Sequence, residues 1–596
     1  MIQWKSFRQV SVWAFATIAA VAVSVLAAQA QLTFSSPLNI SHNAGGGPQL
    51  YVDRSGNIDA LWLQNPAGAS VPDVFFSRST NNGASFSTPV DVSSGVSAII
   101  REWPVVGVDS SGRIDIAWLN EYQTASGAPL VVDVYFTQST NGGTSFSLAQ
   151  NISLDGEGGP AAQFNYTVEP DGHIDVTWPD DSSGSSQIYF THSIDGGATF
   201  SAPRNISNAP TGTNGSGGAI LPFTAVDSAG NINVIWTQGP VTPPYSGKND
   251  VFFTRSADNG ATFGNSQNVT NTANVSGESG GSFQLSLDSA GDIDVFWASA
   301  PGAGFVTQSK DQGATFSASN PLPNAFNRIA VEPGGNIDVF SVQSQIVSGS
   351  PFNGTAVYQD TGSFSRSTDG GVTFSTPQTV ATGYHNSTSQ GSMQANMMVD
   401  ATGAIDIAIA IGSSASGNPA DLHVLRSTDN GATFTTTNVS NDGGYMTFYI
   451  YTPTIAADSS GNASVAWEDA TQSDNILFSR GVNPNPPAPA IRSLSLSTSS
   501  VNAPGVLQGT VTLTQPAPKG NAKVTISSSN LHALAGPPQV VVHAGQTQAQ
   551  FVIVALPTSS QITVTISAAY DGTNGSAPLT INPFRLVSHE VFRKLQ

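Results

Sequence analysis

Residues 79–86 read Ser-Thr-Asn-Asn-Gly-Ala-Ser-Phe, and this octet recurs along most of the chain. Each copy has Ser first, Asp or Asn third, Gly fifth and Phe eighth. The other copies begin at Ser139, Ser193, Ser256, Ser309, Ser367 and Ser427. Successive copies start 53 to 63 residues apart, a period long enough for four short strands with loops of variable length. The chain is therefore expected to be a repeat protein.

A second motif precedes each octet and joins an apolar run, an Asp/Glu-x-x-Gly turn and an alternating apolar segment. Its first copy runs Val52-Asp-Arg-Ser-Gly-Asn-Ile-Asp59 and leads to Trp62. The other copies start at Val108, Val168, Val226, Leu287, Val331, Val399 and Ala457. The pattern predicts two strands joined by the Asp/Glu-x-x-Gly turn, then a third strand, the octet and a fourth strand. Four such strands make one blade of a β-propeller.

The eighth unit lacks an octet and a fourth strand, because its repeat stops at Phe478-Ser-Arg-Gly481. The missing strand is predicted at residues 32–41, whose sequence matches residues 84–93 after the first octet. A propeller must join its first and last blades, since two strand edges would otherwise stay unpaired. We therefore predict an all-β fold, an eight-bladed β-propeller closed by an N-terminal strand.

The octet resembles the Asp-box, or BNR repeat, of sialidase-like β-propellers. Its third residue is expected to be structural, because an Asp or Asn side chain can accept N–H groups across the turn. These positions are Asn81, Asn141, Asp195, Asp258, Asp311, Asp369 and Asp429. The resemblance covers residues 32–481 as a scaffold. It implies no sialidase active site, because sialidases hold the substrate carboxylate with three arginines and only Arg101 and Arg328 are expected near the loop-rich face.

The end of each blade opposite the octets carries loops of variable length, where recognition is expected. Its acidic and aromatic residues suit neutral sugars, because carboxylates accept hydroxyl protons and rings stack on pyranose faces. The candidate ligand-binding residues are Arg101, Trp103, Tyr122, Tyr245, Tyr384, His385 and Tyr451. The candidate carboxylates for glycoside hydrolysis are Glu121, Asp180, Asp181, Glu468 and Asp469. An ordinary polar rim is the alternative for both sets.

Other recurrent residues are predicted to be structural. One Trp per unit, such as Trp62, stands beside Ile at a fixed register, which is typical of packing between blades. A recurrent Arg, such as Arg78, and Asn-x-Ser/Thr sequences at strand ends are interpreted in the same way. No metal or other cofactor is expected, because each turn is taken to offer one carboxylate or none, whereas hard cations require six or more oxygens.

The chain begins with a predicted signal peptide, residues 1–30. Lys5 and Arg8 precede an apolar run that is short for a membrane span, and Ala28-Gln-Ala30 supplies a small-x-small cleavage site. The mature protein is accordingly expected to be secreted, or cell-surface or periplasmic, with no membrane insertion after removal of the leader.

The remaining chain divides into four predicted segments. The propeller is assigned to residues 31–482, and a stiff Pro-rich linker to 483–490. Six or seven alternating strands in residues 491–582 resemble the Ig-like β-sandwiches appended to bacterial exported proteins. Residues 583–596 are assigned to a tail.

The charge and cysteine content of the chain exclude some classes of binding partner and of structure. Only 10% of the residues are charged, and the formal net charge is −20, which disfavours nucleic acid. There is no Cys and therefore no disulfide framework. The preferred hypothesis is a monomeric, non-catalytic protein that binds glycans or cell-surface polymers through the loop face opposite the octets. The alternatives are an exo-glycosidase, sialidase-type or with a carboxylate pair, and a structural protein-interaction scaffold.

Overall fold

The computed structural model describes residues 31–123, 125, 128, 130–154, 164–182, 184–210, 218–239, 249–270, 283–299, 303–351, 354–386, 393–412, 420–440, 452–469, 474–518 and 520–583. Within these residues the regular structure is β-strand, with no α-helix. Accordingly, no helix of this described part has the length and hydropathy needed to cross a bilayer.

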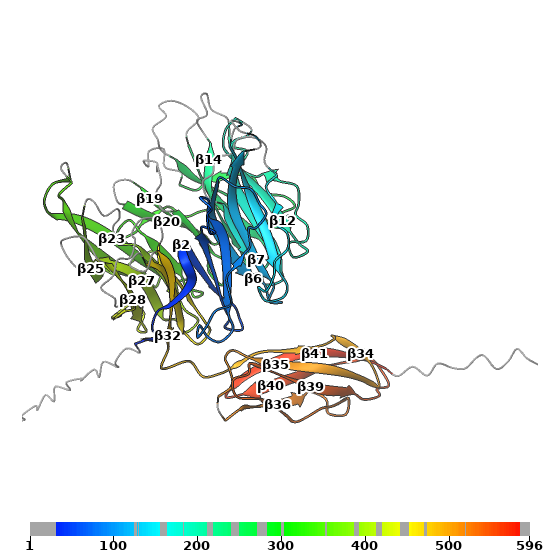
Figure 1. Ribbon diagram of the computed structural model, residues 1–596. Coiled ribbons are helices and arrows are strands. Elements are labelled where there is room, and N and C mark those ends of the chain that lie inside the picture. Colours follow the sequence, from blue (N-terminus) through cyan, green and yellow to red (C-terminus); the bar gives the residue numbers. More distant parts are fainter. Residues whose placement is uncertain are drawn as a thin grey trace, which may run out of the picture.

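Most of the chain forms four-stranded antiparallel sheets in which each strand pairs with the next one along the sequence. The strands of these sheets are β6 (Ile100–Val108), β7 (Ile114–Gln123), β8 (Leu130–Ser139) and β9 (Gln150–Asn151); β10 (Asn165–Val168), β11 (Ile174–Asp180), β12 (Gln187–Ser193) and β13 (Arg204–Asn205); β14 (Ala219–Val226), β15 (Ile232–Gln238), β16 (Asp250–Ser256) and β17 (Gln267–Asn268); β18 (Phe283–Leu287), β19 (Ile293–Ser299), β20 (Ala303–Ser309) and β21 (Asn320–Pro321); β22 (Arg328–Val331), β23 (Ile337–Ser348), β24 (Val357–Ser367) and β25 (Gln378–Asn386); and β26 (Ala395–Val399), β27 (Ile405–Gly412), β28 (Ala420–Ser427) and β29 (Thr435–Asn438). The sheets stand side by side as the blades of a β-propeller (Figure 1).

One larger sheet joins the beginning of the described chain to the end of the repeat region. Its strands are β30 (Thr454–Ala457), β31 (Ala463–Asp469), β32 (Asn475–Val482), β1 (Thr33–Phe34), β2 (Leu38–Val52), β3 (Ile58–Gln64), β4 (Asp73–Ser79) and β5 (Val90–Asp91). The first residues of β2 pair with β32, Leu38 lying opposite Phe478, and its last residues pair with β3. The predicted pairing of residues 32–41 with the unit that ends near residue 481 is confirmed.

Neighbouring sheets are held together by aromatic contacts. The Phe that ends an octet packs edge-on against a Phe of the preceding four-stranded unit, with ring centroids 4.8 to 5.1 Å apart. These pairs are Phe146 with Phe76, Phe200 with Phe136, Phe263 with Phe190, Phe316 with Phe253, Phe434 with Phe364, and Phe86 with Phe478. The octet Phe therefore packs between four-stranded units. Its contact in the last pair joins β32 to the octet that follows β4.

The recurrent Trp residues are buried, as the packing interpretation requires. They are Trp62, Trp118, Trp178, Trp236, Trp297 and Trp467. Each lies in the second strand of its sheet, and most stack on an aromatic ring of the third strand, as Trp62 does on Phe75. An exposed sugar platform built from these residues is excluded by their burial.

The Asn-x-Ser/Thr sequences clamp the fourth strand to the third. In five Asn-x-Ser/Thr sequences of the fourth strands, and in the related Asp91-Val-Ser93, the hydroxyl oxygen accepts a hydrogen bond of 2.9 to 3.3 Å from a backbone N–H of the third strand. The pairs are Ser93 with Val74, Ser153 with Val134, Ser207 with Ile188, Thr270 with Val251, Ser440 with Leu422, and Ser41 with Ile476. The structural interpretation of these sequences is confirmed.

Each octet closes by hydrogen bonds among its own residues. In the octet of Asp195, the backbone N–H of Thr199 donates to Asp195 Oδ1 and its hydroxyl to Asp195 Oδ2, while Ser193 Oγ accepts from the backbone N–H of Gly197. Asn81 accepts the corresponding backbone N–H from Ser85. The structural role predicted for the third residue is confirmed.

The segment after the Pro-rich linker is a two-sheet sandwich around one apolar core. Its strands are β33 (Ile491–Leu496), β35 (Gly505–Leu513), β39 (Gln548–Ala555) and β37 (Leu534–Ala535) in one sheet, and β34 (Ser500–Asn502), β41 (Thr573–Asn582), β40 (Ile562–Tyr570), β36 (Ala522–Ser528) and β38 (Gln539–Val542) in the other. Gln515 touches the propeller, because its side chain hydrogen-bonds to Ser459 O and Ser460 Oγ.

Candidate functional site

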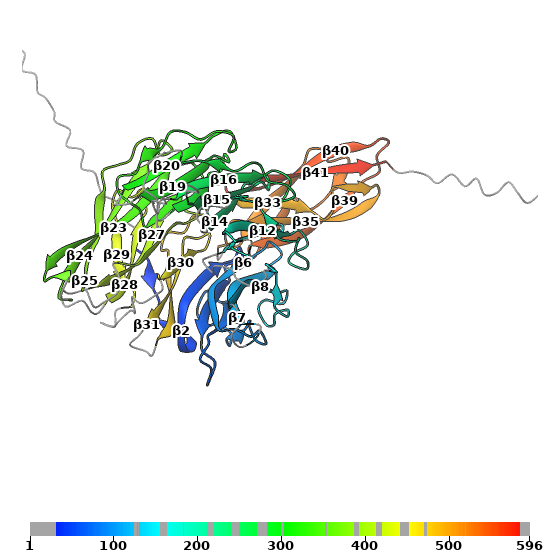
Figure 2. The ribbon, with the colours of Figure 1, turned by 90° about the horizontal axis from the view of Figure 1, so that it is seen from above.

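A central cavity of about 450 Å³ lies among the innermost strands of the propeller. The strands β2, β6, β14, β22 and β26 contribute lining residues, together with residues at the start of β10 and β30. Figure 2 shows β6, β14 and β30 near the middle of the propeller, with the other strands of their sheets further out. No single sheet therefore forms this cavity.

The cavity lies at the end of the sheets opposite the octets. Its lining residues Asn165, Arg328 and Thr454 are the first residues of their strands, and Glu102 is the third residue of β6. The Asp/Glu-x-x-Gly turn follows the first strand of each sheet and the octet follows the third strand. Because neighbouring strands are antiparallel, the first and third strands both end at the opposite end of the sheet. The variable loops and the cavity consequently share one end of the propeller.

Arg328 is the one basic residue among those that line the cavity in the described part of the chain. Its Nη1 donates a 2.7 Å hydrogen bond to Asn327 O, and it forms no ion pair with a described carboxylate. Burial lowers the pKa of its guanidinium from the ordinary value. A partly desolvated cation without a carboxylate partner is suited to hold an anionic or strongly hydrogen-bonding group of a ligand.

Glu102 is the one carboxylate among the described lining residues of the cavity, and Glu121 lies close to it. Glu121 is opposite Ile100 in the register of β6 and β7, so Glu102 and Glu121 share a face as diagonal neighbours. Burial, and secondarily the negative charge of Glu102, raises the pKa of the Glu121 carboxyl. The sequence pattern indicated Glu121 as a candidate carboxylate but did not indicate Glu102 as its partner. Acid–base hydrolysis of a glycosidic bond requires at least two such carboxyl groups.

Arg101 does not line the cavity, contrary to its assignment as a ligand-binding residue. Its side chain is only 5% exposed, its Nη1 lies 2.5 Å from Asp73 Oδ1, and it also donates to Pro72 O and Val96 O. These partners belong to the preceding sheet and its connection, so Arg101 ties β6 to that sheet. Both arginines expected near the loop-rich face stand at this end of their sheets, but of the two Arg328 alone lines the described part of the cavity.

Tyr384 and His385 were expected in a recognition loop, and the structure places them in β25. His385 Nδ1 lies 2.8 Å from Asp360 Oδ2, and its ring stacks on Tyr358 at 4.6 Å. The Tyr384 hydroxyl accepts a hydrogen bond from Gln359. The prediction failed because β23 and β24 continue beyond the usual strand length, which extends the fourth strand with them. These two residues pack an outer strand and do not contribute to the cavity.

The other candidates are spread over the loop end. Tyr122 donates a hydrogen bond of 2.8 Å to Asp133. Asp180 is buried and accepts a hydrogen bond from Ser182 N, whereas Asp181 is exposed. Glu468 and Asp469 end the second strand of another sheet, half-buried and buried respectively. None of these five lines the cavity as far as the structure describes it. Tyr245, Tyr451 and the side chain of Trp103 lie outside the described residues.

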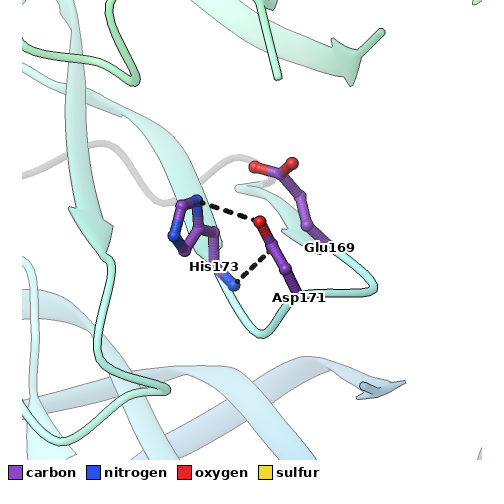
Figure 3. Close-up of side chains that lie close together, drawn as sticks. All are labelled: Glu169, Asp171 and His173. Atoms are coloured by element: carbon purple, nitrogen blue, oxygen red, sulfur yellow. Dashed lines mark hydrogen bonds and ion pairs between the residues drawn. The ribbon is translucent and has the colours of Figure 1, made fainter. Parts of the chain in front are cut away.

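One Asp/Glu-x-x-Gly turn departs from the prediction that each such turn offers at most one carboxylate. Between β10 and β11 the side chains of Glu169, Asp171 and His173 bring oxygen and nitrogen atoms within 4.8 Å of one another (Figure 3). Asp171 accepts a hydrogen bond from the backbone N–H of His173, and its other oxygen lies 3.7 Å from His173 Nδ1. This turn lies at the octet end, away from the cavity.

No family model matches the chain, and no curated protein matches it. Three similar solved structures are an ulvan lyase of polysaccharide lyase family PL25 bound to -[GlcA(1-4)Rha3S]- (14% identity, 69% of this chain and 94% of that chain, TM-score 0.38), the GH93 α-L-arabinofuranosidase of Fusarium graminearum with arabinobiose (13%, 52% and 91%, 0.35), and a mutant NanB sialidase from Streptococcus pneumoniae (13%, 76% and 71%, 0.31). With scores this low, none of them assigns a role to a residue of this chain.

Proposed function

We propose that this chain is an exported, eight-bladed sialidase-like propeller with an Ig-like sandwich, and that it binds a glycan or a surface polymer without cleaving it. The binding site is the central cavity at the loop end. Residues 32–41 complete the eighth blade, and the octets at the other end serve as Asp-boxes that hold the scaffold.

Arg328 is the observation that carries the proposal. A guanidinium that is partly desolvated and has no described carboxylate partner is costly unless a ligand uses it. It gives the site a place for one anionic group, such as a sugar carboxylate, beyond the neutral sugars suggested by composition. Glu102, Asn165 and Gln49 line the same cavity and offer acceptors and donors for hydroxyl groups, while Phe164 and Phe223 offer ring surface.

Glycoside hydrolysis is the second candidate, and the coupling between Glu102 and Glu121 favours it. Diagonal positions on neighbouring strands are roughly 7–8 Å apart, within the range of the two carboxyl groups of inverting glycosidases. The raised pKa of Glu121 suits a general acid, and Glu102 would act as the base. Arg328 is the one arginine among the described lining residues of the cavity, which argues against sialidase-type chemistry, because that chemistry requires a triad.

A glycan array followed by titration calorimetry tests the binding proposal. Arg328→Gln is expected to weaken binding of the selected glycan about 10- to 100-fold, because a hydrogen bond to a charged group contributes about 1.5–3 kcal/mol. Arg54→Gln is the matched control, since Arg54 is an exposed arginine in an Asp/Glu-x-x-Gly turn at the opposite end. Equal losses in both variants, or no bound glycan, would contradict the proposal.

The catalytic alternative is tested separately with a panel of fluorogenic glycosides. No product release is expected from the wild-type chain. Release that falls at least about 100-fold in both Glu102→Gln and Glu121→Gln would establish the second candidate instead. Unchanged release in these variants would assign the activity to other residues.

A further inference from the structure

A recurrent cluster of charges holds the Asp/Glu-x-x-Gly turns to their sheets. An arginine of the third strand bridges two carboxylates, one in the turn and one in the second strand. Three described sheets have the complete cluster: Arg78 with Asp53 and Asp59, Arg366 with Glu332 and Asp338, and Arg426 with Asp400 and Asp406. In each case the arginine is the direct register partner of the second-strand carboxylate. The cluster confirms the structural interpretation of the recurrent arginine.

The sheet β10–β13 keeps both carboxylates but lacks the arginine. Glu169 occupies the turn position and Asp175 the second-strand position, the same residue types as Glu332 and Asp338. The register partner of Asp175 is His192. An imidazole has neither the reach nor the permanent charge of a guanidinium, so the two carboxylates lose the donor that bridges them elsewhere.

Other sheets that lack this arginine carry a substitute. In β6–β9, Arg113 of the turn itself pairs with Asp109 and Asp115 at 3.3 and 3.1 Å. In β18–β21, Gln308 donates a 2.5 Å hydrogen bond to Asp294, and Lys310 lies 4.0 Å from Asp292. The sheet β10–β13 has no such described donor.

Asp175 shows the consequence. Asp175 is only 2% exposed and its Oδ2 has no hydrogen-bond partner, while its carboxyl group is within hydrogen-bonding reach of that of Glu169. The nearest arginine of the neighbouring sheet, Arg113, donates to Gly172 O in this turn, but its charge is already shared by Asp109 and Asp115. Two carboxyl groups in contact, one of them buried, can both be ionised only when a cation joins them.

The turn itself supplies the ligands for such a partner. Ligand atoms of Glu169, Asp171 and His173 lie close together, with the Asp171 and His173 side chains 63% and 29% exposed to solvent (Figure 3). The Asp175 carboxyl group is in contact with that of Glu169. One imidazole nitrogen with carboxylate oxygens suits a borderline divalent ion such as Zn²⁺ better than Ca²⁺, which prefers six to eight oxygens.

We propose that the turn between β10 and β11 binds one divalent transition-metal ion, with Zn²⁺ as the chemical type, through Glu169, Asp171 and His173. The positive charge of the ion replaces that of the arginine found in the other sheets, and it offsets the negative charge of the Asp175 carboxylate. It fastens this turn to its sheet and takes no part in the central cavity.

Zn²⁺ and Co²⁺ titrations of the full chain, freed of metal with a chelator, test the proposal. One equivalent of Zn²⁺ is expected to bind and to raise the melting temperature, and Co²⁺ is expected to give a visible absorption band typical of mixed nitrogen and oxygen ligands. His173→Ala should weaken binding at least about 10-fold, since ligand loss removes a direct metal bond. Glu332→Gln, in the sheet that has its arginine, is the matched control and should bind metal as the wild type does.

A second variant, His192→Arg, tests the proposal even if His173→Ala does not fold. His192→Arg restores the arginine, so this variant should be more stable than the wild type without metal and should lose the Zn²⁺-dependent rise in melting temperature. Two results would overturn the proposal. One is the absence of saturable binding by the wild type, which would mean that Glu169 and Asp175 share a proton instead. The other is equal binding by the wild type, His173→Ala and His192→Arg.

Discussion

At the residue scale, the octet aspartates are the acids whose pKa values have a clear local cause. The pKa values of Asp195, Asp311 and Asp369 are lowered to about 2, because a threonine hydroxyl and a backbone N–H donate to each ionised carboxylate. An aspartate in the unfolded chain has a pKa of about 3.9. The folded state thus binds protons less readily, and the stability that these groups contribute is present above about pH 4 and is lost as the pH falls toward 2.

Replacing these three aspartates with Asn should flatten this part of the pH dependence. Asn81 and Asn141 show that the octet accepts Asn without changing its backbone hydrogen bonds. We expect the melting temperature of the wild type to fall more steeply between pH 4 and pH 2 than that of the triple variant. Asp571→Asn, at an exposed turn of the sandwich, is the control. Parallel curves for the wild type and the triple variant would be inconsistent with the assigned hydrogen bonds.

The octets could be predicted because most of the hydrogen-bonding partners of their Asp or Asn residues lie within the same eight residues. The structural role of Arg101 could not be predicted. Its ion-pair partner Asp73 belongs to another sheet, and the relative position of the two sheets depends on the whole structure. Glu102 was missed for the same reason. Its closeness to Glu121 follows from the pairing of β6 with β7 around an irregularity in the register, which no local pattern reveals.

At the element scale, the octet glycine combines two demands. Gly431 has a φ of +80°, and a Cβ there would overlap the ring of Phe364 in the preceding sheet. Gly403, in the Asp/Glu-x-x-Gly turn of the sheet β26–β29, has a φ of +82° but open space around it. The two glycines therefore separate the cost of the backbone conformation from the cost of the contact.

Gly403→Ala should lower the free energy of unfolding by about 1–2 kcal/mol, the penalty for a left-handed conformation. Gly431→Ala should cost a further amount of about 1–3 kcal/mol, because the methyl group has to displace Phe364. Urea unfolding of both variants measures the difference. Equal losses would mean that the ring moves away freely and that the octet glycine serves its φ angle alone.

Strand lengths set the limit of prediction at this scale. The alternation and the turns identify the strand order, because every unit repeats them. The extension of β23 and β24 depends on polar residues that pair across the hairpin, such as Ser344 with Asp360, and it moved Tyr384 and His385 from an expected loop into β25.

At the scale of the whole molecule, the N-terminal strand joins sequence ends that are more than 400 residues apart. Ile40 is 1% exposed and packs in the cluster that contains Trp62, Ile476 and Phe478. Ile40→Asp should cost about 3 kcal/mol or more, because it buries a charge without a partner and breaks this junction. Leu148→Asp, at a side chain 93% exposed, should change the stability by no more than about 0.5 kcal/mol.

Thermal unfolding of these two variants reports on the junction. A loss confined to Ile40→Asp is the expected result. If Ile40→Asp were as stable as the wild type, the contact between the N-terminal strand and β32 would contribute nothing to the propeller.

The central cavity also belongs to this scale, since it exists only where the innermost strands of many sheets meet. A crystal structure of the chain with the glycan selected from the array tests the proposed function most directly. We expect the glycan in the central cavity, with one of its oxygens within hydrogen-bonding distance of the Arg328 guanidinium and a hydroxyl group against Glu102. A glycan bound instead at the octet end, on the sandwich or on the outer strands would contradict the account.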